Sequence, residues 1–492
     1  MSFNSLLFIL FFLPLCIGIY HLLPNKAENI ALLMINLLFY ALCDELLVVL
    51  IVISAMINFV FGQLIYQKKR KTVLIAGIII NLLFLGFFKY YNFFITSFHD
   101  IFGNRLSGAQ IPGLIPGLVL PLGISFFTFR AISYHIDIYR QKTTPADDLV
   151  PFMAYFTLFP LITAGPIVRY TDLHEQLTDR VVSLPFFLTG LERFILGLIK
   201  KVLVAGTFAA ISDRIFTVPF AELSMGLAWA GILSYTFQIF FDFAGYTDMA
   251  IGIGNMLGFR FAENFNYPYI ARNIQDFWQR WHMTLSSWLR DYIFLPLAYV
   301  VSNRLKKERY FAIRTDRIIY FISILITFFI CGFWHGAGWN FIAWGLWFAT
   351  FLIFEQFGMK RWLKRSWIPV QHLYTLLVVV IGWVIFRSEN LDGAISYIGR
   401  MFSFSLGDRS RTSELLFYMV NSETLFMTLL AIILSIPALP WLEAIILKKY
   451  SENRVCSRLL STVKIVVLTL FFIVSLSYIS SSSYQPFLYK QF

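Results

Sequence analysis

Charged residues are scarce in this chain. They make up 14% of its 492 residues, hydrophobic residues make up 58%, and the mean hydropathy is +0.70. Ordinary soluble domains carry about 25% charged residues, and disordered chains are poor in apolar ones, so both classes are excluded. No polar stretch is long enough to build a hydrophobic core of its own. We therefore expect one polytopic membrane domain that covers residues 1–492.

Several chemical signatures are also missing. The sequence has no phosphate loop of the GxxxxGK[ST] or GxGxxG kind, no GxSxG nucleophile turn and no HExxH zinc motif. Its four cysteines show neither metal-ligand spacing nor a disulfide framework; they are Cys16, Cys43, Cys331 and Cys456. These absences argue against a nucleotide-driven pump and against a metal site.

Positive charge is present in excess, with a net charge of +12. The basic residues fall in short clusters between apolar runs, which is typical of topology signals and of contacts with anionic lipid, so no nucleic-acid partner is expected. The cluster Lys68–Lys71 indicates a cytoplasmic loop and places the N-terminus outside. The same counting leaves the C-terminal tail, Ser480–Phe492, outside.

Apolar runs follow one another along the whole chain. They cover 5–23, 30–42, 46–66, 73–95, 118–136, 150–168, 186–205, 227–244, 246–259, 288–301, 318–335, 338–357, 369–386, 424–446 and 461–479. A crossing helix needs about 20 residues, so the shorter runs are expected to be re-entrant or interfacial. We predict about 10–13 crossings in an all-α fold. The first run lacks a basic leader and is expected to be an anchor that is not cleaved.

His335 is the only Asp, Glu, Lys, Arg or His between residues 318 and 354. Basic clusters close both ends of this run, so both ends face the cytoplasm and the chain must turn near the histidine, where Gly336 and Gly338 permit a turn. The clusters are Arg304, Lys306, Lys307, Arg309, Arg314 and Arg317 before it, and Lys360, Arg361, Lys364 and Arg365 after it. A titratable group at membrane depth is costly and indicates function. We predict that this imidazole lies at the wall of an internal cavity.

A second histidine, His282, lies in a segment rich in tryptophan. From Ile274 onward, apolar residues recur at spacings of three and four, which predicts an amphipathic helix. Trp278, Trp281 and Trp288 beside one histidine would suit the wall of a narrow channel. They would equally suit an interfacial aromatic belt with a solvated histidine.

Other polar groups interrupt apolar runs. Asp242 and Asp248 would suit a proton relay or a structural role, bonded to an arginine or a helix terminus. Arg130 and His135 are expected to be structural. The two prolines within 158–166 suggest a broken helix that lines the cavity.

A buried histidine without a neighbouring serine or cysteine nucleophile suits general-base activation of a substrate hydroxyl. A transporter that uses histidine as a proton relay would need the same residues. The residues alone leave both functions open.

Five stretches nevertheless resemble the membrane-bound O-acyltransferase family, in particular the branch that acetylates bacterial exopolysaccharides such as alginate. They are PLGISFFTFRAISYHIDIYR (121–140), FPLITAGPIVRYTDL (159–173), FFDFAGYTDMAIGIGNMLGFRFAENFNYPYI (240–270), DFWQRWHMTLSSWLRDYIFLPL (276–297) and GFWHGAGWNFIAWG (332–345). The resemblance is good over residues 1–390 and weaker over 391–492.

The resemblance implies a ring of transmembrane helices around a central funnel, with His335 and His282 as the catalytic histidines. The tunnel is expected to be lined by Trp278, Arg280, Trp281, Trp334 and Asn340. It implies no bound cofactor, an acyl donor such as acetyl-CoA or another acyl thioester, and a location in the bacterial inner membrane. It also implies a polysaccharide acceptor and a periplasmic acetyltransferase partner of the SGNH type. Peptidoglycan acetylation and D-alanyl transfer are the alternatives within the family.

Overall fold

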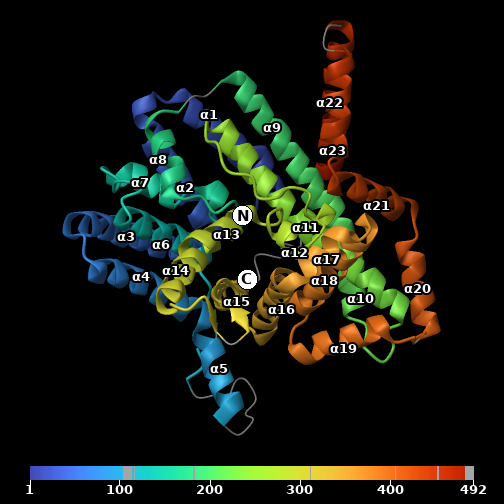
Figure 1. The fold of residues 1–492 in the computed structure, drawn as a ribbon. Helices are drawn as coiled ribbons and strands as arrows, with labels where there is room; N and C mark the ends of the chain where they lie inside the picture. Colours follow the sequence, from blue (N-terminus) through green and yellow to red (C-terminus); the bar gives the residue numbers. More distant parts are fainter. Residues whose placement is uncertain are drawn as a thin grey trace. The chain divides into compact units, whose positions relative to one another are not determined.

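The computed structural model describes residues 1–102, 113–115, 117–180, 183–310, 312–404, 406–450 and 454–481. Within them the chain is all-α, as predicted, apart from a hairpin of two-residue strands, β1 (Arg309–Tyr310) and β2 (Ile313–Arg314) (Figure 1). Most of the C-terminal tail, which the sequence places outside, lies beyond the described residues.

The chain divides into two compact units. The first comprises Met1–Leu191 with Ala250–Ala262, and the second comprises Glu192–Met249 with Glu263–Phe492. Two of the three boundaries fall within helices α9 and α11, and the third, between Ala262 and Glu263, falls in the loop after α11. The single domain and the ring around a funnel stay predictions.

The first unit is built from short and long apolar helices that pack in pairs. They are α1 (Leu13–Leu22), α2 (Glu28–Asp44), α3 (Val48–Lys68), α4 (Lys71–Leu85), α5 (Tyr91–Phe102), α6 (Ile124–Tyr139), α7 (Leu149–Phe156) and α8 (Tyr170–Thr178). Helix α6 packs against α3 and α4, and α7 packs against α2 and α3. Nearly every side chain of α6 is buried.

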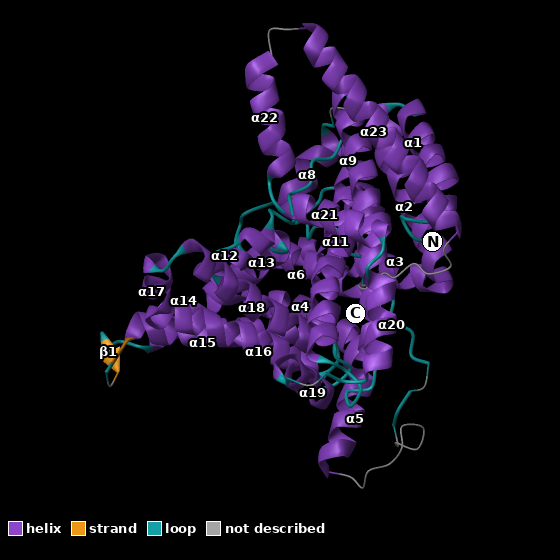
Figure 2. Cartoon of the chain, turned by 90° about the vertical axis from the view of Figure 1, so that its right-hand side faces the viewer, coloured by secondary structure: helices purple, strands orange, loops and turns teal. Residues whose placement is uncertain are grey.

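The second unit holds the remaining helices, except for the start of α9 and the end of α11, which belong to the first unit. They are α9 (Leu184–Ile199), α10 (Gly206–Phe216), α11 (Met225–Met256), α12 (Ile274–Trp278), α13 (Met283–Leu289), α14 (Leu295–Arg304), α15 (Thr315–His335), α16 (Trp339–Phe354), α17 (Lys360–Arg365), α18 (Ile368–Arg387), α19 (Leu391–Phe402), α20 (Arg409–Met419), α21 (Ser422–Ser435), α22 (Ala438–Tyr450) and α23 (Arg454–Ser481). Helix α15 packs chiefly against α16, which also packs against α18. Figure 2 shows the β1–β2 hairpin, in orange, at the end of α14 and α15.

Eight helical segments of the described chain are long and apolar enough to cross a membrane. They are Glu28–Lys68, Lys71–Phe102, Leu184–Phe216, Met225–Met256, Thr315–His335, Trp339–Arg365, Ile368–Arg387 and Arg458–Ser481. Three more apolar helices are shorter: Phe8–Leu22, Leu149–Leu161 and Ser422–Ser435. The protein is therefore a multi-pass membrane protein with short apolar helices beside its long ones.

Two boundaries predicted from the sequence are wrong. The runs 227–244 and 246–259 form one helix, α11, of 32 residues. Gly245 does not end a span, because it serves helix contact: a Cβ there would lie 2.6 Å from the carbonyl oxygen of Gly197 on α9. The run 424–446, in contrast, is broken into α21 and α22, since Pro437 cannot donate the hydrogen bond that would continue α21.

The helix break predicted within 158–166 is confirmed, since α7 ends at Phe156, whereas its position at a cavity stays a prediction. A buried arginine binds the carbonyl groups that the break exposes. Arg130, 1% exposed, donates to the carbonyl oxygens of Tyr155 (3.3 Å), Phe156 (2.8 Å) and Leu161 (2.6 Å). A broken helix leaves carbonyls without partners, and these bonds replace them. Arg130 is thus structural, as expected.

Candidate active site

The predicted turn near His335 is confirmed, but its glycines are not needed for their backbone conformation. Residues Gly336 and Gly338 are extended, with φ of −164° and −159°, which any residue adopts. What they provide is space. A Cβ at Gly336 would lie 2.2 Å from the ring of Phe341, and a Cβ at Gly338 would lie 2.5 Å from Asn340 Oδ1. The glycines let the first turn of α16 fold back closely on the end of α15.

Helices α15 and α16 also touch backbone to backbone. A Cβ at Gly332 would lie 2.3 Å from the carbonyl oxygen of Phe341, and one at Gly345 would lie 2.2 Å from that of Phe328. Such approach fixes the position of α15, whose last residue is His335. With 21 residues α15 is about 31 Å long, which matches the hydrocarbon thickness of a bilayer.

The imidazole of His335 is 4% exposed and has aromatic neighbours on several sides. Ring centroids lie 4.8 Å away for Trp334, 4.9 Å for Trp344 and 5.4 Å for Phe386. Trp344 comes from α16 and Phe386 from the end of α18. The three helices therefore enclose the histidine in a largely apolar environment.

The segment around His282 is not the single amphipathic helix that the spacing predicts. It forms two short helices, α12 and α13, separated at residues 279–282. His282 has a left-handed backbone, with φ 43° and ψ 54°. The helix breaks because Asn264 competes for the backbone: its carbonyl oxygen accepts from Met283 N (2.9 Å), and its side-chain oxygen accepts from Thr284 N (3.3 Å).

His282 is buried, with 1% exposure, so the solvated histidine of an interfacial belt is excluded. Its Nδ1 lies 3.0 Å from Asn264 Oδ1, and its Nε2 has no hydrogen-bond partner among the described residues. Burial lowers the pKa of His282 to about 3, because a charged imidazolium would be poorly solvated there. The ring is therefore neutral at physiological pH.

Both histidines belong to one aromatic cluster. The Trp334 ring lies 6.5 Å from His282 as well as 4.8 Å from His335. Trp278 and Trp344 are 5.8 Å apart, and Trp344 contacts His335. The cluster also contains Trp281, Trp383, Phe243, Phe277, Phe348 and Phe386. The structure thus brings together the two histidines and three of the five residues expected to line the tunnel.

The other two expected tunnel residues are polar and form hydrogen bonds with groups that are not part of the aromatic cluster. Arg280 is 28% exposed in its side chain and bonds to Asp276 Oδ1 (2.8 Å) and to the Asn266 carbonyl (3.2 Å). Asn340 is buried, and its Nδ2 donates to the carbonyl oxygen of Ser388 (2.8 Å). This bond joins the start of α16 to the end of α18.

A buried carboxylate that the sequence did not single out holds the start of α12. Glu355, 3% exposed, accepts from the backbone N–H groups of Ile274 (2.6 Å) and Gln275 (3.2 Å). Tyr374 donates to the same carboxylate at 3.2 Å. A carboxylate at a helix N-terminus stabilises it, so Glu355, which directly follows α16, anchors the segment that carries Trp278 and Trp281.

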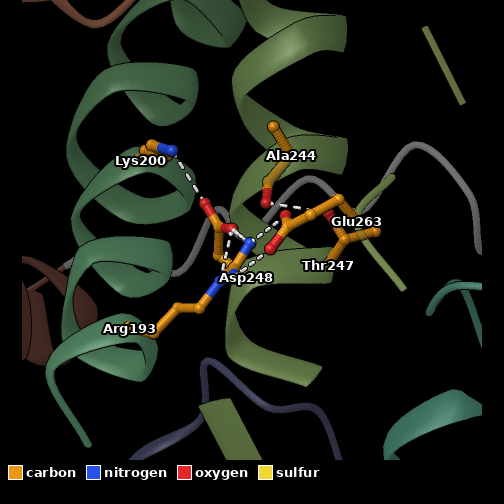
Figure 3. A network of polar contacts seen from close by, with 6 residues as sticks. All are labelled: Arg193, Lys200, Ala244, Thr247, Asp248 and Glu263. Atoms are coloured by element: carbon orange, nitrogen blue, oxygen red, sulfur yellow. Dashed lines mark hydrogen bonds and ion pairs between the residues drawn. The ribbon is translucent and has the colours of Figure 1, made fainter. Parts of the chain in front are cut away.

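The two aspartates of α11 are not paired with each other, because each has its own cation from α9 and the π-helical segment Lys200–Ala205. Asp242 pairs with Lys201, and both side chains are buried. Asp248 pairs with Lys200 (2.7 Å) and Arg193 (2.9 Å). Figure 3 shows the Arg193 guanidinium between the carboxylates of Asp248 and Glu263, with Lys200 at the other side of Asp248. The arrangement suits a clamp between helices.

His135 belongs to the first unit. Its Nε2 lies 3.3 Å from the carbonyl oxygen of Asn58, and it is fully buried, which suits the structural role expected of it. Among the described residues, no group of three or more His, Cys, Asp and Glu side chains could hold a metal ion.

Four residues of the site were not predicted from the sequence: Trp344, Trp383 and Phe386 of the cluster, and also Asn264. Trp344 lies nine residues after His335. Because the chain was predicted to turn near His335 and run back, a residue at this distance could have been expected beside the histidine. Asn264 and the α18 residues reach the site by tertiary packing, for which the sequence carries no local signal.

Comparison with known proteins identifies the family of this chain. Residues 147–388 match the profile of MBOAT, the membrane-bound O-acyltransferase family. The matched segment includes both histidines and all five expected tunnel residues.

Curated relatives match over most of the chain. The probable alginate O-acetylase AlgI of Azotobacter vinelandii is 40% identical over 82% of this chain and 78% of its own length. That of Pseudomonas putida is 36% identical over the whole of both chains. The peptidoglycan O-acetyltransferase of Helicobacter pylori is 35% identical over 81% of this chain and 79% of its own length.

Proposed function

The chain belongs to the membrane-bound O-acyltransferase family, and from that premise we propose that it transfers acetyl groups from a cytoplasmic thioester across the membrane. The acceptor is a cell-surface polysaccharide, or a periplasmic acetyltransferase of the SGNH type that passes the acetyl group on. The observation that carries the proposal is the pair of buried histidines in one aromatic cluster, within a chain similar to two kinds of polymer O-acetylating protein.

In the proposed reaction His335 is the general base. Its imidazole takes the proton of the acceptor hydroxyl as the hydroxyl oxygen attacks the thioester carbonyl. The carbon–sulfur bond then breaks, and the imidazolium returns the proton to the leaving thiolate, so that atoms and charge balance. Acetyl-CoA or another acyl thioester serves as the donor substrate, and the step needs no bound cofactor.

The aromatic cluster suits this chemistry in two ways. We propose that Trp278, Trp281 and Trp334 line a passage for a thin acyl–thioester chain, where their apolar rings would exclude water that would otherwise hydrolyse the donor. His282, neutral and buried, is the second catalytic histidine. Arg280 and Asn340 act, in this proposal, at the ends of the tunnel, where Arg280 is partly exposed and Asn340 joins two helix ends.

The basic clusters orient the reaction. By the positive-inside rule they support a cytoplasmic position for Lys68–Lys71, Lys306–Arg317 and Lys360–Arg365 and an outside N-terminus, in the bacterial inner membrane that we propose. The His335 end of α15 then lies toward the acceptor side.

Reconstituted protein tests the proposal. Purified protein in sealed vesicles, oriented with the basic clusters exposed, is given radiolabelled acetyl-CoA or an acetylated carrier outside and a polysaccharide or SGNH protein inside. Label should appear on the enclosed acceptor. Transfer of D-alanine but not acetyl from a carrier would replace the proposal by D-alanylation, and no transfer from any thioester would contradict it.

Orientation is tested separately by single cysteines. In intact cells a membrane-impermeant maleimide should fail to label a cysteine in place of Trp362, which is 58% exposed beside the second basic cluster. The same reagent should label a cysteine in place of Phe404, 94% exposed after α19. Labelling at Trp362 from outside would overturn the orientation.

A further inference from the structure

The side-chain oxygen of Asn264 is a junction of three hydrogen bonds. It lies 3.0 Å from His282 Nδ1, 2.8 Å from Thr284 Oγ1 and 3.3 Å from Thr284 N. Asparagine oxygen and nitrogen are assigned from their partners. The Thr284 backbone N–H can only donate, so the atom that faces it must be the oxygen.

This assignment fixes the protonation of His282. An amide oxygen can only accept, so Nδ1 must carry the proton and donate it to Asn264. The lone pair is then on Nε2, which is buried and has no hydrogen-bond partner among the described residues. The Nε2 atom of His282 is thus prepared as an acceptor.

Backbone hydrogen bonds also fix the position of the His282 imidazole. His282 has φ 43°, a left-handed conformation that is uncommon outside glycine and persists where neighbouring bonds impose it. Those bonds are Met283 N to the Asn264 carbonyl and Asn266 N to the Arg280 carbonyl, each 2.9 Å. Residues 264–266 therefore clamp the turn that presents the imidazole, and Phe243 packs edge-on against the ring at 4.8 Å.

We propose that Asn264 is a positioning residue for acyl transfer, which holds His282 in the tautomer whose Nε2 accepts a hydrogen bond. His282 then accepts from an O–H or N–H group of the substrate, and it does not donate to the oxyanion of the tetrahedral intermediate. This inference rests on the proposed acyl transfer and adds the direction of the hydrogen bond at the second histidine.

Three variants test it by acyl transfer per mole of monodisperse protein. Asn264→Leu removes the acceptor, so kcat should fall by about a hundredfold or more with little change in KM, as expected when an imidazole loses its orienting partner. Asn264→Asp keeps an oxygen acceptor for Nδ1–H and should recover most of kcat. Asn390→Leu is the matched control: Asn390 caps α19 by accepting from Gly393 N at 2.8 Å, and its loss should leave kcat unchanged.

The tautomer itself gives a readout that a structural role would not move. In protein labelled with ¹⁵N-histidine, the His282 signals, assigned by their loss in His282→Gln, should show protonated Nδ1 and unprotonated Nε2. In Asn264→Leu this preference should disappear. A protonated Nε2 in the unsubstituted protein, or normal kcat in Asn264→Leu, would overturn the proposal. If no thioester supports transfer, the proposed function fails, and the NMR result alone decides the role of Asn264.

Discussion

Two helix pairs of the second unit both pack closely through glycines, but they differ in the polar groups beside the contact. The α9–α11 pair meets at Gly197 and Gly245, and the α15–α16 pair meets at Gly332 and Gly345. Beside the first contact, each aspartate is joined to at least one cation. Beside the second, the polar group is an imidazole among tryptophan and phenylalanine rings.

This difference indicates a structural role for the charged residues between α9 and α11 and a catalytic role for the imidazole near the α15–α16 turn. A buried charge must be paired, and the pair resists a change in protonation, because that change would leave the partner charge uncompensated. An imidazole can be buried neutral, and it then remains able to take a proton when a substrate arrives. Of the polar residues that interrupt apolar runs, those of α11 thus suit a clamp and those near the α15–α16 turn suit a catalyst.

The strongest test of this contrast removes the imidazole. His335→Ala should lower acetyl transfer by about 10²–10⁴-fold, the usual contribution of a general base, with unchanged abundance and thermal midpoint. His99→Ala, a histidine of α5 remote in sequence, is the control and should keep its activity. The measurement is initial rate per mole of purified protein; near-normal transfer by His335→Ala would remove the histidine from the mechanism.

Breaking the buried ion pair of Asp242 and Lys201 should lower the stability of the protein. Asp242→Asn leaves Lys201 buried beside a neutral partner, and loss of one member of a buried pair costs about 3–5 kcal/mol. The thermal midpoint in detergent should fall, while specific activity of the folded fraction stays unchanged.

A double variant checks the cause. Lys201→Met with Asp242→Leu removes both charges and should recover most of the lost midpoint. A normal midpoint with lost specific activity in Asp242→Asn would instead favour the proton relay over the clamp.

A smaller loss of stability is expected when a side chain is added at the close contact in the α15–α16 turn. Gly336→Ala would place a Cβ 2.2 Å from the Phe341 ring, and such overpacking costs about 1–3 kcal/mol. Because His335 is the adjacent residue, kcat should fall too. Gly399→Ala on α19, where a Cβ would meet no atom within 4 Å, is the control and should change neither stability nor activity. Unchanged melting of Gly336→Ala would show that the turn tolerates a side chain.

The smallest effect is expected at the solvent end of the clamp. Glu263 pairs with Arg193, yet its side chain is 52% exposed. Exposed ion pairs contribute about 0–1 kcal/mol, so Glu263→Gln should barely shift the thermal midpoint. A shift as large as that of Asp242→Asn would mean that the whole network, and not its buried part, holds α9 to α11.

Local patterns in the sequence account for much of the fold. The apolar runs predict the all-α membrane class, the glycines predict the turn after His335, and the prolines predict the broken helix that Arg130 completes. Two of the wrong predictions share one cause. Gly245 suggested a boundary and the spacing around His282 suggested one helix, but partners distant in sequence decided both, Gly197 in one case and Asn264 in the other.

The sequence alone determined that this protein is embedded in a membrane, and it singled out the two histidines that we propose as catalytic. With 58% hydrophobic residues and one histidine in a long apolar run, burial of an imidazole follows from composition and order. Only the tertiary structure decided how the groups are used. Asn264 lies 18 residues from His282 and Glu355 lies 81 residues from Ile274, and no periodicity brings such residues together. The direction of a hydrogen bond and the neutrality of a buried ring depend on which atoms face each other across packed helices, and that geometry exists only once the chain has folded.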